Sequence, residues 1–458
     1  MKNKTIYRCS VCNYESIGYL GKCPECNSWS SLEEVMIDTK QKSRSQARLF
    51  EKKAIKKLEE ISSKNSDRIE SSLKEFDRVM GGGIVRDSVT ILTAKPGAGK
   101  STLLLQIANN LATKGYKILY ASGEESESQI KSRADRVIKE IHENMWVVSD
   151  NSMDNLLESI DEIDPDFIIV DSIQTFTLED FPNSRPGSPT QTMECAYELV
   201  KKAKNTSRPR SIFIVGQMTK EDELAGVRAL EHLVDVVLLI EGESGEELRT
   251  LITSKNRYGS TGEMGFFNMT EEGMLSIDNP SEYFMTKREK EDMVSGSSLT
   301  VVREGTRPII LEIESLVSDS FTPYPSRISE SMRKDQLNTL ISILEQRGGV
   351  KLYDKNVVIK TTGGIKLKEH ASNLAVIMSI ASSTFDSPIP NDMVFLADVG
   401  LTGELKKVPS LEARLREVDR IGFKKAIIPY DSSTNKKYKN LQLIQLKTLK
   451  DVIRLIFN

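Results

Sequence analysis

The segment that most constrains the fold is a glycine-rich turn, KPGAGKST, at residues 95–102. The apolar run VTILTA before it (89–94) predicts a buried strand, and STLLLQIANNLATKG after Lys100 predicts an apolar-faced helix. Such a turn is typical of phosphate-binding loops, because its glycines let backbone N–H groups face phosphate oxygens. We expect the whole turn to contact phosphate, through Lys95, Pro96, Gly97, Ala98, Gly99, Lys100, Ser101 and Thr102.

Two side chains of this turn have specific expected roles. Lys100 should reach the β- and γ-phosphates, and the Ser101 hydroxyl should coordinate Mg²⁺, which makes ATP and Mg²⁺ the expected cofactors. The strict pattern has glycine six residues before the lysine, where this chain has Ala94. The alternative interpretation is an ordinary glycine-rich turn between a strand and a helix.

Further apolar runs alternate with helical segments, which favours a mostly parallel α/β sheet. A polar helix should follow the run KILYAS (117–122) and extend to about residue 143. LRTLITSKNRYG (248–259) and the FFNMT segment should add edge strands. The predicted core strands are KILYAS (117–122), DFIIVDS (166–172), SIFIVGQ (211–217) and DVVLLIEG (235–242).

Polar residues at the ends of these strands are candidates for catalysis. Asp171 closes FIIVD and fits a Walker B carboxylate that holds Mg²⁺ through water. Glu124 or Glu125, just after KILYAS, could polarise the attacking water, and Gln217 could sense the γ-phosphate. A carboxylate or amide at a strand end can instead be a structural cap.

Four of the five cysteines form two closely spaced pairs, Cys9-x2-Cys12 and Cys23-x2-Cys26. Two such pairs supply tetrahedral coordination by four sulfurs, which suits a structural Zn²⁺. Disulfides or chance clustering are the alternatives. Trp29 should pack as core against this site. Cys195 should be a buried inert thiol, and Trp146 a core residue.

Charge and hydropathy exclude several classes of protein. The 458 residues include 63 Lys and Arg against 66 Asp and Glu, a net charge of −3, which excludes supercharged chains. No run approaches the roughly 18 apolar residues of a membrane span. The start, MKNKTIYRCSVC, has no apolar signal core, so we expect a cytoplasmic protein without a membrane partner. The three histidines (His142, His232 and His370) are scattered and suggest no metal site.

Composition divides the chain into four parts. Residues 1–35 form the cysteine module, and 36–65 a basic linker in which Lys40 to Lys57 holds eight basic residues against Glu51 alone. Residues 66–284 hold the α/β pattern. Residues 285–458 are α+β in character, with helices expected near 332–347, 368–384 and 410–421.

The order of motifs resembles the RadA (Sms) family of bacterial DNA-repair ATPases, which belong to the RecA superfamily. The resemblance is carried by GGGIVRDSVTILTAKPGAGKSTLLLQ, YASGEES, FIIVDSIQT, LAGVRALEHLVD and SKNRYG. GTRPIILEIESLV and the segment after 332 resemble that family's Lon-protease-like domain. The resemblance implies a RecA-like P-loop core, preceded by a four-cysteine zinc finger and followed by this α+β domain.

The resemblance also implies roles for single residues. Glu124 takes the position of the catalytic glutamate, Asp171 that of Walker B, and Gln217 that of the γ-phosphate sensor, where the family is expected to have histidine and RecA has glutamine. Lys255 and Arg257 match residues that contact nucleotide or DNA across a subunit boundary, as an arginine finger does. The family forms hexameric rings.

DNA contacts are implied for two loops that occupy the positions of RecA-type DNA-binding loops, FPNSRPGSPTQT (181–192) and TKEDELAGVR (219–228). Arg185, Lys220 and Arg228 are candidates for phosphate contacts, although exposed loop charge is an equal alternative. Phe176 and Phe181 could stack on bases, but core packing is favoured.

A Lon-type protease pairs a nucleophilic serine with a lysine base. By resemblance these positions hold Ala371, beside Ser372, and Arg414. Arginine stays charged at physiological pH and is a poor base, which argues against proteolysis. The domain is instead expected to serve assembly and DNA binding, with basic surface in KLKEH, RLREVDR and KKYKN.

The phosphate-loop motifs together with this resemblance imply an ATP-driven DNA motor for repair and homologous recombination. It would bind single-stranded DNA, process branched intermediates and work beside a RecA-type recombinase. One alternative is an ATP-gated module that loads a recombinase without translocating, and a less favoured one is an ATP-dependent protease.

Overall fold

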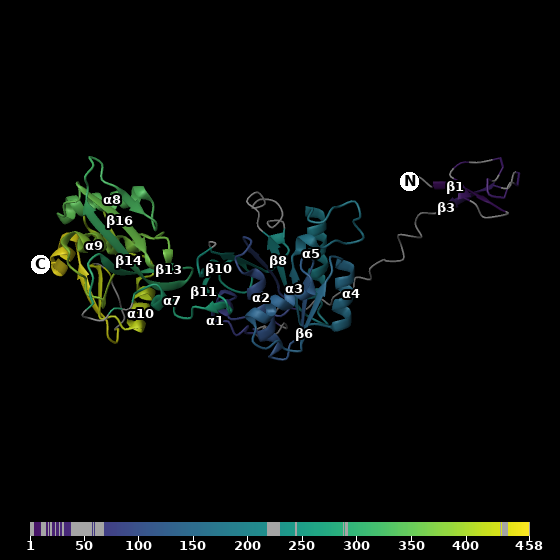
Figure 1. The fold of residues 1–458 in the computed structure, drawn as a ribbon, viewed down its shortest axis with the longest axis horizontal. Helices are drawn as coiled ribbons and strands as arrows, with labels where there is room; N and C mark the ends of the chain where they lie inside the picture. The colour runs from purple at the N-terminus through teal and green to yellow at the C-terminus, as the bar shows by residue number, and fades with distance from the viewer. Residues whose placement is uncertain are drawn as a thin grey trace. The chain divides into compact units, whose positions relative to one another are not determined.

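The computed structural model describes most of the chain from residue 68 onward and parts of the N-terminal segment. The described residues are 4–10, 15–16, 18, 21–22, 24–26, 28–29, 32–37, 57, 59, 68–217, 230–242, 245–286, 288, 292–430, 432 and 438–457. The chain divides into two compact units, Met1–Lys64 and Asn65–Asn458 (Figure 1). This division falls at the end of the predicted basic linker.

The N-terminal unit contains a small antiparallel sheet in the order β2-β1-β3, formed by β1 (Lys4–Cys9), β2 (Glu15–Ser16) and β3 (Leu32–Ile37). Trp29 forms an isolated bridge with Lys22, and its side chain is 75% exposed. The prediction that Trp29 is a core residue was therefore wrong. A unit this small buries a smaller share of its surface than a large domain, and the indole instead lies beside the Lys22 ammonium, 5.7 Å from the ring centroid.

The second unit is built on a nine-stranded sheet in the order β12-β11-β10-β9-β4-β8-β7-β5-β6. Its parallel strands are β4 (Val89–Ala94), β5 (Ile118–Ser122), β6 (Met145–Ser149), β7 (Phe167–Asp171), β8 (Ser211–Gln217) and β9 (Val236–Glu241). The antiparallel extension is β10 (Leu248–Asn256), β11 (Met264–Thr270) and β12 (Gly273–Ser276). The expected α/β sheet and its added strands are confirmed.

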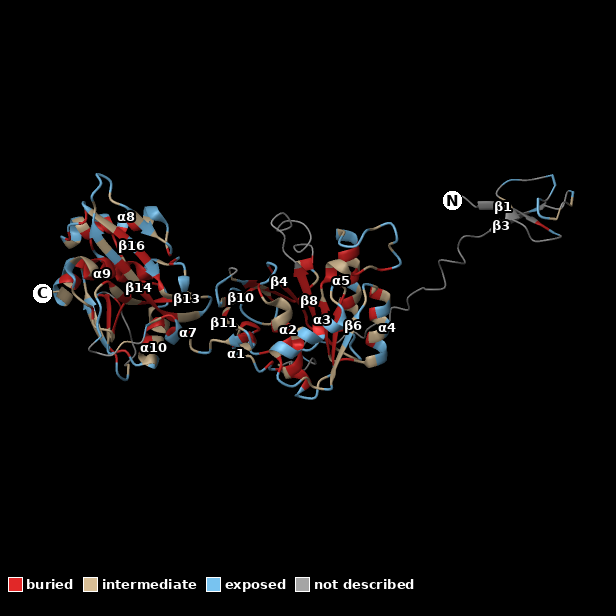
Figure 2. Cartoon of the chain, in the orientation of Figure 1, coloured by how far each residue is buried: buried red, intermediate tan, exposed pale blue. Residues whose placement is uncertain are grey.

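Helices cover both faces of this sheet, whose strands carry the red core in Figure 2. Because side chains alternate along a strand, Leu92 and Tyr120 pack on one face and Ile91 and Leu119 on the other. The first face is covered by α1 (Lys74–Val79), α2 (Lys100–Ala112) and α3 (Glu127–Val137), and the second by α4 (Met153–Ile163) and α5 (Pro189–Ala203).

The remainder of the second unit is α+β, as expected. A four-stranded sheet, in the order β13-β14-β16-β15, comprises β13 (Ser297–Glu304), β14 (Arg307–Asp319), β15 (Arg327–Ser329) and β16 (Lys355–Thr361). Smaller sheets contain β17 (Met393–Phe395), β20 (Lys425–Pro429) and β21 (Gln442–Leu446), and β18 (Asp398–Val399) with β19 (Leu405–Lys406). The helices are α7 (Pro280–Tyr283), α8 (Lys334–Ile343), α9 (Asn373–Phe385), α10 (Leu411–Ile421) and α11 (Leu449–Phe457).

Specific contacts join this α+β region to the large sheet within the second unit. Phe266 of β11 and Phe284 pack edge to face, with centroids 5.3 Å apart, in the same core as α9. Arg307 at the start of β14 forms an ion pair of 2.6 Å with Glu75 of α1. The exact limits of the four predicted domains stay predictions.

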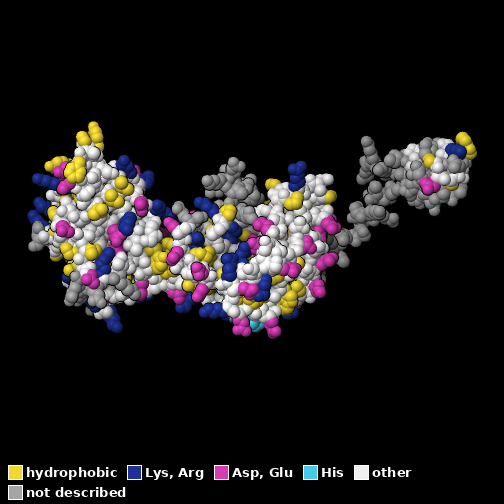
Figure 3. Space-filling view, in the orientation of Figure 1, with side chains coloured by type: hydrophobic (Ala, Val, Ile, Leu, Met, Phe, Trp, Pro, Cys, Tyr) yellow, Lys and Arg dark blue, Asp and Glu magenta, His cyan; other side chains and the backbone are white. Residues whose placement is uncertain are grey.

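Charge on the face shown in Figure 3 is mixed, with Lys and Arg side chains lying among Asp and Glu. This agrees with the near-neutral total charge. Among the described residues, no helix is long and apolar enough to cross a membrane.

Candidate nucleotide site

The predicted ATPase residues lie at one edge of the large sheet. Ala94 at the end of β4 is level with Gln217 at the end of β8, and Ser122 at the end of β5 is level with Asp171 at the end of β7. The sheet order makes β4, β8, β7 and β5 consecutive neighbours. The glycine-rich turn and the residues that follow β5 and β7 therefore leave the sheet at its carboxyl edge, where ligands bind in open α/β sheets.

The backbone of the glycine-rich turn suits an anionic ligand. Gly97 and Gly99 have φ values of 79° and 103°, a conformation that favours glycine. A Cβ atom built on Gly97 would have no other atom within 4 Å, so open space lies against the turn. Gly99 caps α2, whose first N–H groups have no partner within the helix and attract negative charge. The turn therefore fits a phosphate group.

Lys100 lies beside this loop. Its ammonium donates a hydrogen bond to the backbone carbonyl of Ala94 at 3.1 Å. Since the acceptor is a backbone atom, alanine at position 94 provides this contact as glycine would. Burial lowers the pKa of Lys100, while the nearby carboxylates of Asp171 and Glu124 act in the opposite direction.

Asp171 and Ser101 form a candidate Mg²⁺ site. The Ser101 hydroxyl donates to Asp171 Oδ2 at 2.7 Å, and the Tyr120 hydroxyl donates to the same oxygen at 2.6 Å. A hydroxyl and a carboxylate are the hard oxygen ligands that Mg²⁺ prefers. Burial is the main cause that raises the pKa of Tyr120 well above its usual value, so its phenol stays a donor.

Tyr120 was not among the predicted site residues. Only its position in the strand relative to Asp171 indicates that it belongs to the site. Tyr120 is level with Ile169 on the neighbouring strand, and Asp171 lies two residues further along on the same face. The contact follows from strand order and register, which the local pattern does not contain.

The two adjacent glutamates after β5 have different partners. Glu125 forms a bidentate ion pair with Arg133 of α3, with Nη1 to Oε2 at 2.7 Å. Glu124 Oε1 instead accepts a hydrogen bond from the hydroxyl of Ser172 at 2.6 Å. Glu124 therefore faces the segment that carries Asp171, whereas Glu125 is held by a helix. Ser172 was not among the predicted site residues either.

Lys255 and Arg257 lie at the opposite edge of the sheet. Asn256 is level with Val236 on β9, and Val236 is level with Thr90 near the start of β4. This level lies roughly 13 Å along the strand from Ala94, at about 3.3 Å per residue. The structure does not bring these two cations to the glycine-rich turn of the same chain.

Both cations have partners within the chain. The Lys255 ammonium donates to the backbone carbonyls of Val234, at 2.9 Å, and Glu231. Arg257 forms an ion pair of 3.0 Å with the buried carboxylate of Asp235. Burial is the main cause that lowers the pKa of Lys255, and the neighbouring charge of Arg257 adds to it.

One of the three predicted DNA-contacting loop residues is described. Arg185 is exposed on the segment that follows β7, whereas Lys220 and Arg228 lie outside the described residues. The predicted loop 181–192 ends early, because Ser188 caps α5 and Pro189 begins it. Phe176 is buried in the core and Phe181 packs against the same core, as the core interpretation expected.

Two of the four predicted zinc ligands are described. The Sγ atoms of Cys9 and Cys26 lie 3.6 Å apart, and neither cysteine forms a disulfide. Zn–S bonds of about 2.3 Å in a tetrahedron place two sulfurs roughly 3.8 Å apart. The spacing therefore fits two ligands of one metal ion. Cys12 and Cys23 lie outside the described residues.

The residues at the Lon-type catalytic positions are buried in structural contacts. Ser372 donates to the backbone carbonyl of Glu369 at 2.9 Å. Arg414 is fully buried, pairs with the Glu369 carboxylate at 2.5 Å and also donates to the carbonyl of Val301. Burial is the main cause that lowers the pKa of Arg414, and Glu369 opposes this. Arg414 acts here as a structural cation.

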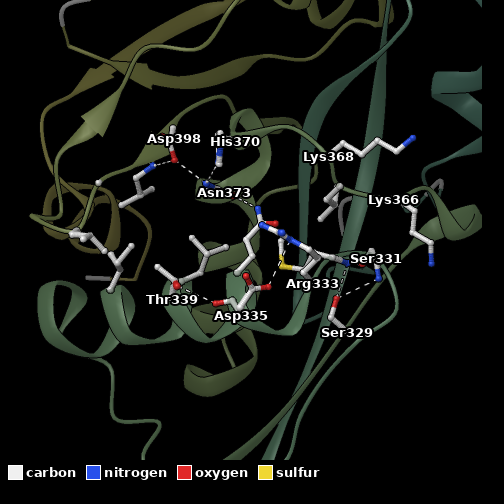
Figure 4. A pocket seen from close by; sticks show the side chains of 18 of the residues that line it. Ser329, Ser331, Arg333, Asp335, Thr339, Lys366, Lys368, His370, Asn373 and Asp398 are labelled. Atoms are coloured by element: carbon white, nitrogen blue, oxygen red, sulfur yellow. Dashed lines mark hydrogen bonds and ion pairs between the residues drawn. The ribbon is translucent and has the colours of Figure 1, made fainter. Parts of the chain in front are cut away.

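A pocket of about 940 Å³ lies in the same region, beside α8 (Figure 4). Lys366 and Lys368, from the predicted basic segment KLKEH, line it together with Arg333. On its other side Asn373 donates to the carboxylate of Asp398 at 2.7 Å. The pocket thus has a mixed lining with several exposed cations.

Comparisons with known proteins agree with this geometry. Residues 56–208 match the AAA domain family, and residues 7–34 match the family described as rubredoxin metal binding domain. Together with the converging strand ends, these matches define the chain as a P-loop ATPase with an N-terminal zinc-ribbon module.

Similar proteins specify the family. The chain is 40% identical to the DNA repair protein RadA of Bacillus subtilis, over 99% of this chain and 98% of that protein. It is 38% identical to RadA of Listeria monocytogenes, over 99% and 98% of the two chains, and 38% identical to RadA of Haemophilus influenzae, over 99% of each. The chain therefore belongs to the RadA family of DNA repair proteins, and the resemblance seen in its motifs is confirmed.

Proposed function

We propose that the protein is an ATP-driven DNA motor that acts in DNA repair and homologous recombination. It binds single-stranded DNA and processes branched intermediates as a hexameric ring, beside a RecA-type recombinase. The observation that carries this proposal is the convergence of Lys100, Glu124, Asp171 and Gln217 at one sheet edge. The proposed partners, DNA and a RecA-type recombinase, are supported by the membership of the chain in the RadA family.

Each of these residues has a distinct part in hydrolysis. Lys100 and the N–H groups of the turn hold the phosphates and offset the charge that develops on them. Glu124 orients the attacking water and takes its proton, and Gln217 contacts the γ-phosphate. Mg²⁺, held by Ser101 and through water by Asp171, would supply further positive charge at the phosphates.

Lys255 and Arg257 complete the site of a neighbouring subunit. Their place at the far edge of their own sheet supports this, because a site at the carboxyl edge of the same chain is out of reach. In a ring, one subunit can present this edge to the nucleotide of the next. Assembly and hydrolysis would then depend on each other.

DNA is contacted by the loop that carries Arg185 and by Lys220 and Arg228, and Lys255 and Arg257 contact nucleotide or DNA across the subunit boundary. The α+β region serves as a platform for assembly and DNA rather than as a protease, which the burial of Arg414 against Glu369 supports. Zn²⁺ held by Cys9, Cys12, Cys23 and Cys26 has a structural role, since four protein ligands leave no open position.

The proposal is tested by measuring ATP hydrolysis and unwinding on forked DNA. Wild-type protein should hydrolyse ATP faster with DNA and should unwind the fork, whereas Lys100→Ala should do neither. Lys255→Ala keeps the phosphate loop and should lose unwinding. Wild-type hydrolysis that is indifferent to DNA would contradict the proposal, and DNA binding without unwinding would favour the recombinase-loading alternative.

A further inference from the structure

Ser172 links the predicted catalytic base to the segment that carries Arg185. It follows Asp171 directly, is fully buried, and donates its hydroxyl hydrogen to Glu124 Oε1 at 2.6 Å. This hydrogen bond occupies one acceptor site of the carboxylate and fixes Oε1 against Ser172. The hydroxyl therefore restrains the carboxylate that the proposed function needs.

The backbone around Ser172 is fixed by a single turn of 3₁₀ helix, η2 (Ile173–Thr175). The Thr175 hydroxyl and N–H donate to the Ser172 carbonyl at 2.7 and 3.1 Å. Thr175 also packs against Gly123, where a Cβ atom would lie 2.1 Å from the Thr175 hydroxyl oxygen. The loop that holds Glu124 and the turn that holds Ser172 are thus in close contact, and the Ser172 hydroxyl bridges them.

The same turn lies against the exposed loop that follows it. Gly187, two residues after Arg185, approaches the turn closely enough that a Cβ atom on it would lie 3.5 Å from the Gln174 carbonyl oxygen. The Gln174 side-chain oxygen is buried and has no hydrogen-bond partner among the described residues. The Gln174 side-chain oxygen could therefore accept a hydrogen bond if the turn moves.

One buried side chain holds the loop itself. Gln191 of α5 donates from Nε2 to the carbonyls of Leu178, Phe181 and Ser184, at 3.3, 2.9 and 3.3 Å. Its Oε1 accepts from the Leu178 N–H at 2.9 Å. Four backbone contacts through one amide make this loop (residues 178–188) an ordered arm rather than a loose connection.

We propose that Ser172 is a positioning residue that holds Glu124 back until DNA engages the 178–188 arm. Contact of the arm with a DNA phosphate shifts the 3₁₀ turn, moves the Ser172 hydroxyl away, and frees Glu124 to orient water. This inference rests on the proposed function and adds the route by which DNA controls hydrolysis.

The test compares Ser172→Ala with wild type and with Ser172→Thr, which keeps the hydroxyl. Without DNA, Ser172→Ala should hydrolyse ATP roughly three- to tenfold faster than wild type, because one hydrogen bond no longer restrains Glu124. Its stimulation by single-stranded DNA should fall toward onefold, while its affinity for that DNA stays at the wild-type level. Ser172→Thr should retain the stimulation.

A second variant tests the arm. Gln191→Leu should loosen the loop, keep ATP binding and lose most of the stimulation by DNA. If Ser172→Ala slows hydrolysis equally with and without DNA, or keeps the wild-type stimulation, the coupling is overturned. If single-stranded DNA does not stimulate ATP hydrolysis by the wild type, the proposed function itself is contradicted, and not only the role of Ser172.

Discussion

The two glutamates that follow β5 show how single contacts separate residues that look alike in the sequence. Glu125 is paired with Arg133, and Glu124 faces Ser172 beside Asp171. We expect Glu124→Gln to lower ATP hydrolysis by about 100-fold or more, because a neutral amide cannot take a proton. Glu125→Gln is the matched control and should stay within about threefold of wild type. Steady-state rates at saturating ATP decide this, and the reverse order would contradict the assignment.

Tyr120 gives a second test at the residue scale. Tyr120→Phe removes the hydrogen bond to Asp171 Oδ2 and keeps the buried ring. Since a hydrogen bond to a charged group contributes about 1.5–3 kcal/mol, we expect half-maximal ATPase to need roughly ten- to 100-fold more Mg²⁺. A Mg²⁺ titration of the ATPase rate measures the shift. An unchanged Mg²⁺ requirement would show that Tyr120 only packs.

Cys195 predicts a dependence of stability on pH. Burial raises the pKa of this thiol to about 12, above its usual value of 9. The unfolded chain therefore loses this proton at lower pH than the folded chain. The contribution to stability is complete below pH 9 and is lost as the pH rises toward 12.

Two measurements check this prediction. Native protein at pH 8.5 should resist alkylation at Cys195, as read by mass spectrometry, until denaturant is added. Cys195→Ser should flatten the fall of the unfolding free energy above pH 9. Rapid alkylation of the native protein would contradict the burial of this thiol.

Contiguous residues of the site could be predicted from the sequence, and contacts between elements could not. The turn at 95–102 and the pairs of cysteines are readable because their spacing lies within one segment. Tyr120 and Ser172 act through partners on other segments, so their roles depend on strand order and register. Trp29 was misjudged because burial depends on how much structure surrounds it.

At the scale of elements, strands were more predictable than their boundaries with helices. The apolar runs at 89–94 and 166–172 matched β4 and β7. The polar helix expected to about residue 143 ends at Val137. Ile138 is buried and has an extended backbone, so the helix cannot continue through it, and the chain goes on to the edge strand β6. Segments with weak periodicity, such as β15 and β21, gave no comparable signal.

The contact of α10 with β13 predicts a large effect on stability. Arg414 on α10 is fully buried and joins the Val301 carbonyl to the Glu369 carboxylate. Removing one member of such a pair leaves its partners without compensation, so Arg414→Ala should lower the free energy of unfolding by about 3–5 kcal/mol. Denaturant unfolding measures this, and the partly exposed Glu369→Gln is the milder control. A loss below about 1 kcal/mol would contradict a structural role.

At the scale of the whole molecule, the division at Lys64 separates the metal module from the ATPase. We expect a chelator, or Cys9→Ser, to unfold the antiparallel sheet of β1, β2 and β3 and to leave the thermal transition of the second unit within about 2 °C. Calorimetry with a zinc assay measures both events. A large fall in the main transition after metal removal would show that the two units stabilise each other.

The proposed ring predicts that two inactive variants can restore each other. Lys100→Ala lacks a phosphate loop lysine, and Arg257→Ala lacks the cation that we propose a subunit offers to its neighbour. In a random one-to-one mixture, roughly a quarter of the interfaces would combine an intact Lys100 with an intact Arg257. ATPase activity should reappear on mixing. Activity that stays at the sum of the two separate variants would contradict a contribution across the subunit boundary.

The proposed function requires that DNA binding accelerates ATP hydrolysis at the carboxyl edge of the large sheet. The ATPase rates of wild type and Lys100→Ala, measured with and without single-stranded DNA, test this requirement. We predict that DNA accelerates wild-type hydrolysis several-fold and that Lys100→Ala shows no hydrolysis in either condition. Hydrolysis that persists in Lys100→Ala, or a wild-type rate that DNA leaves unchanged, would contradict the account.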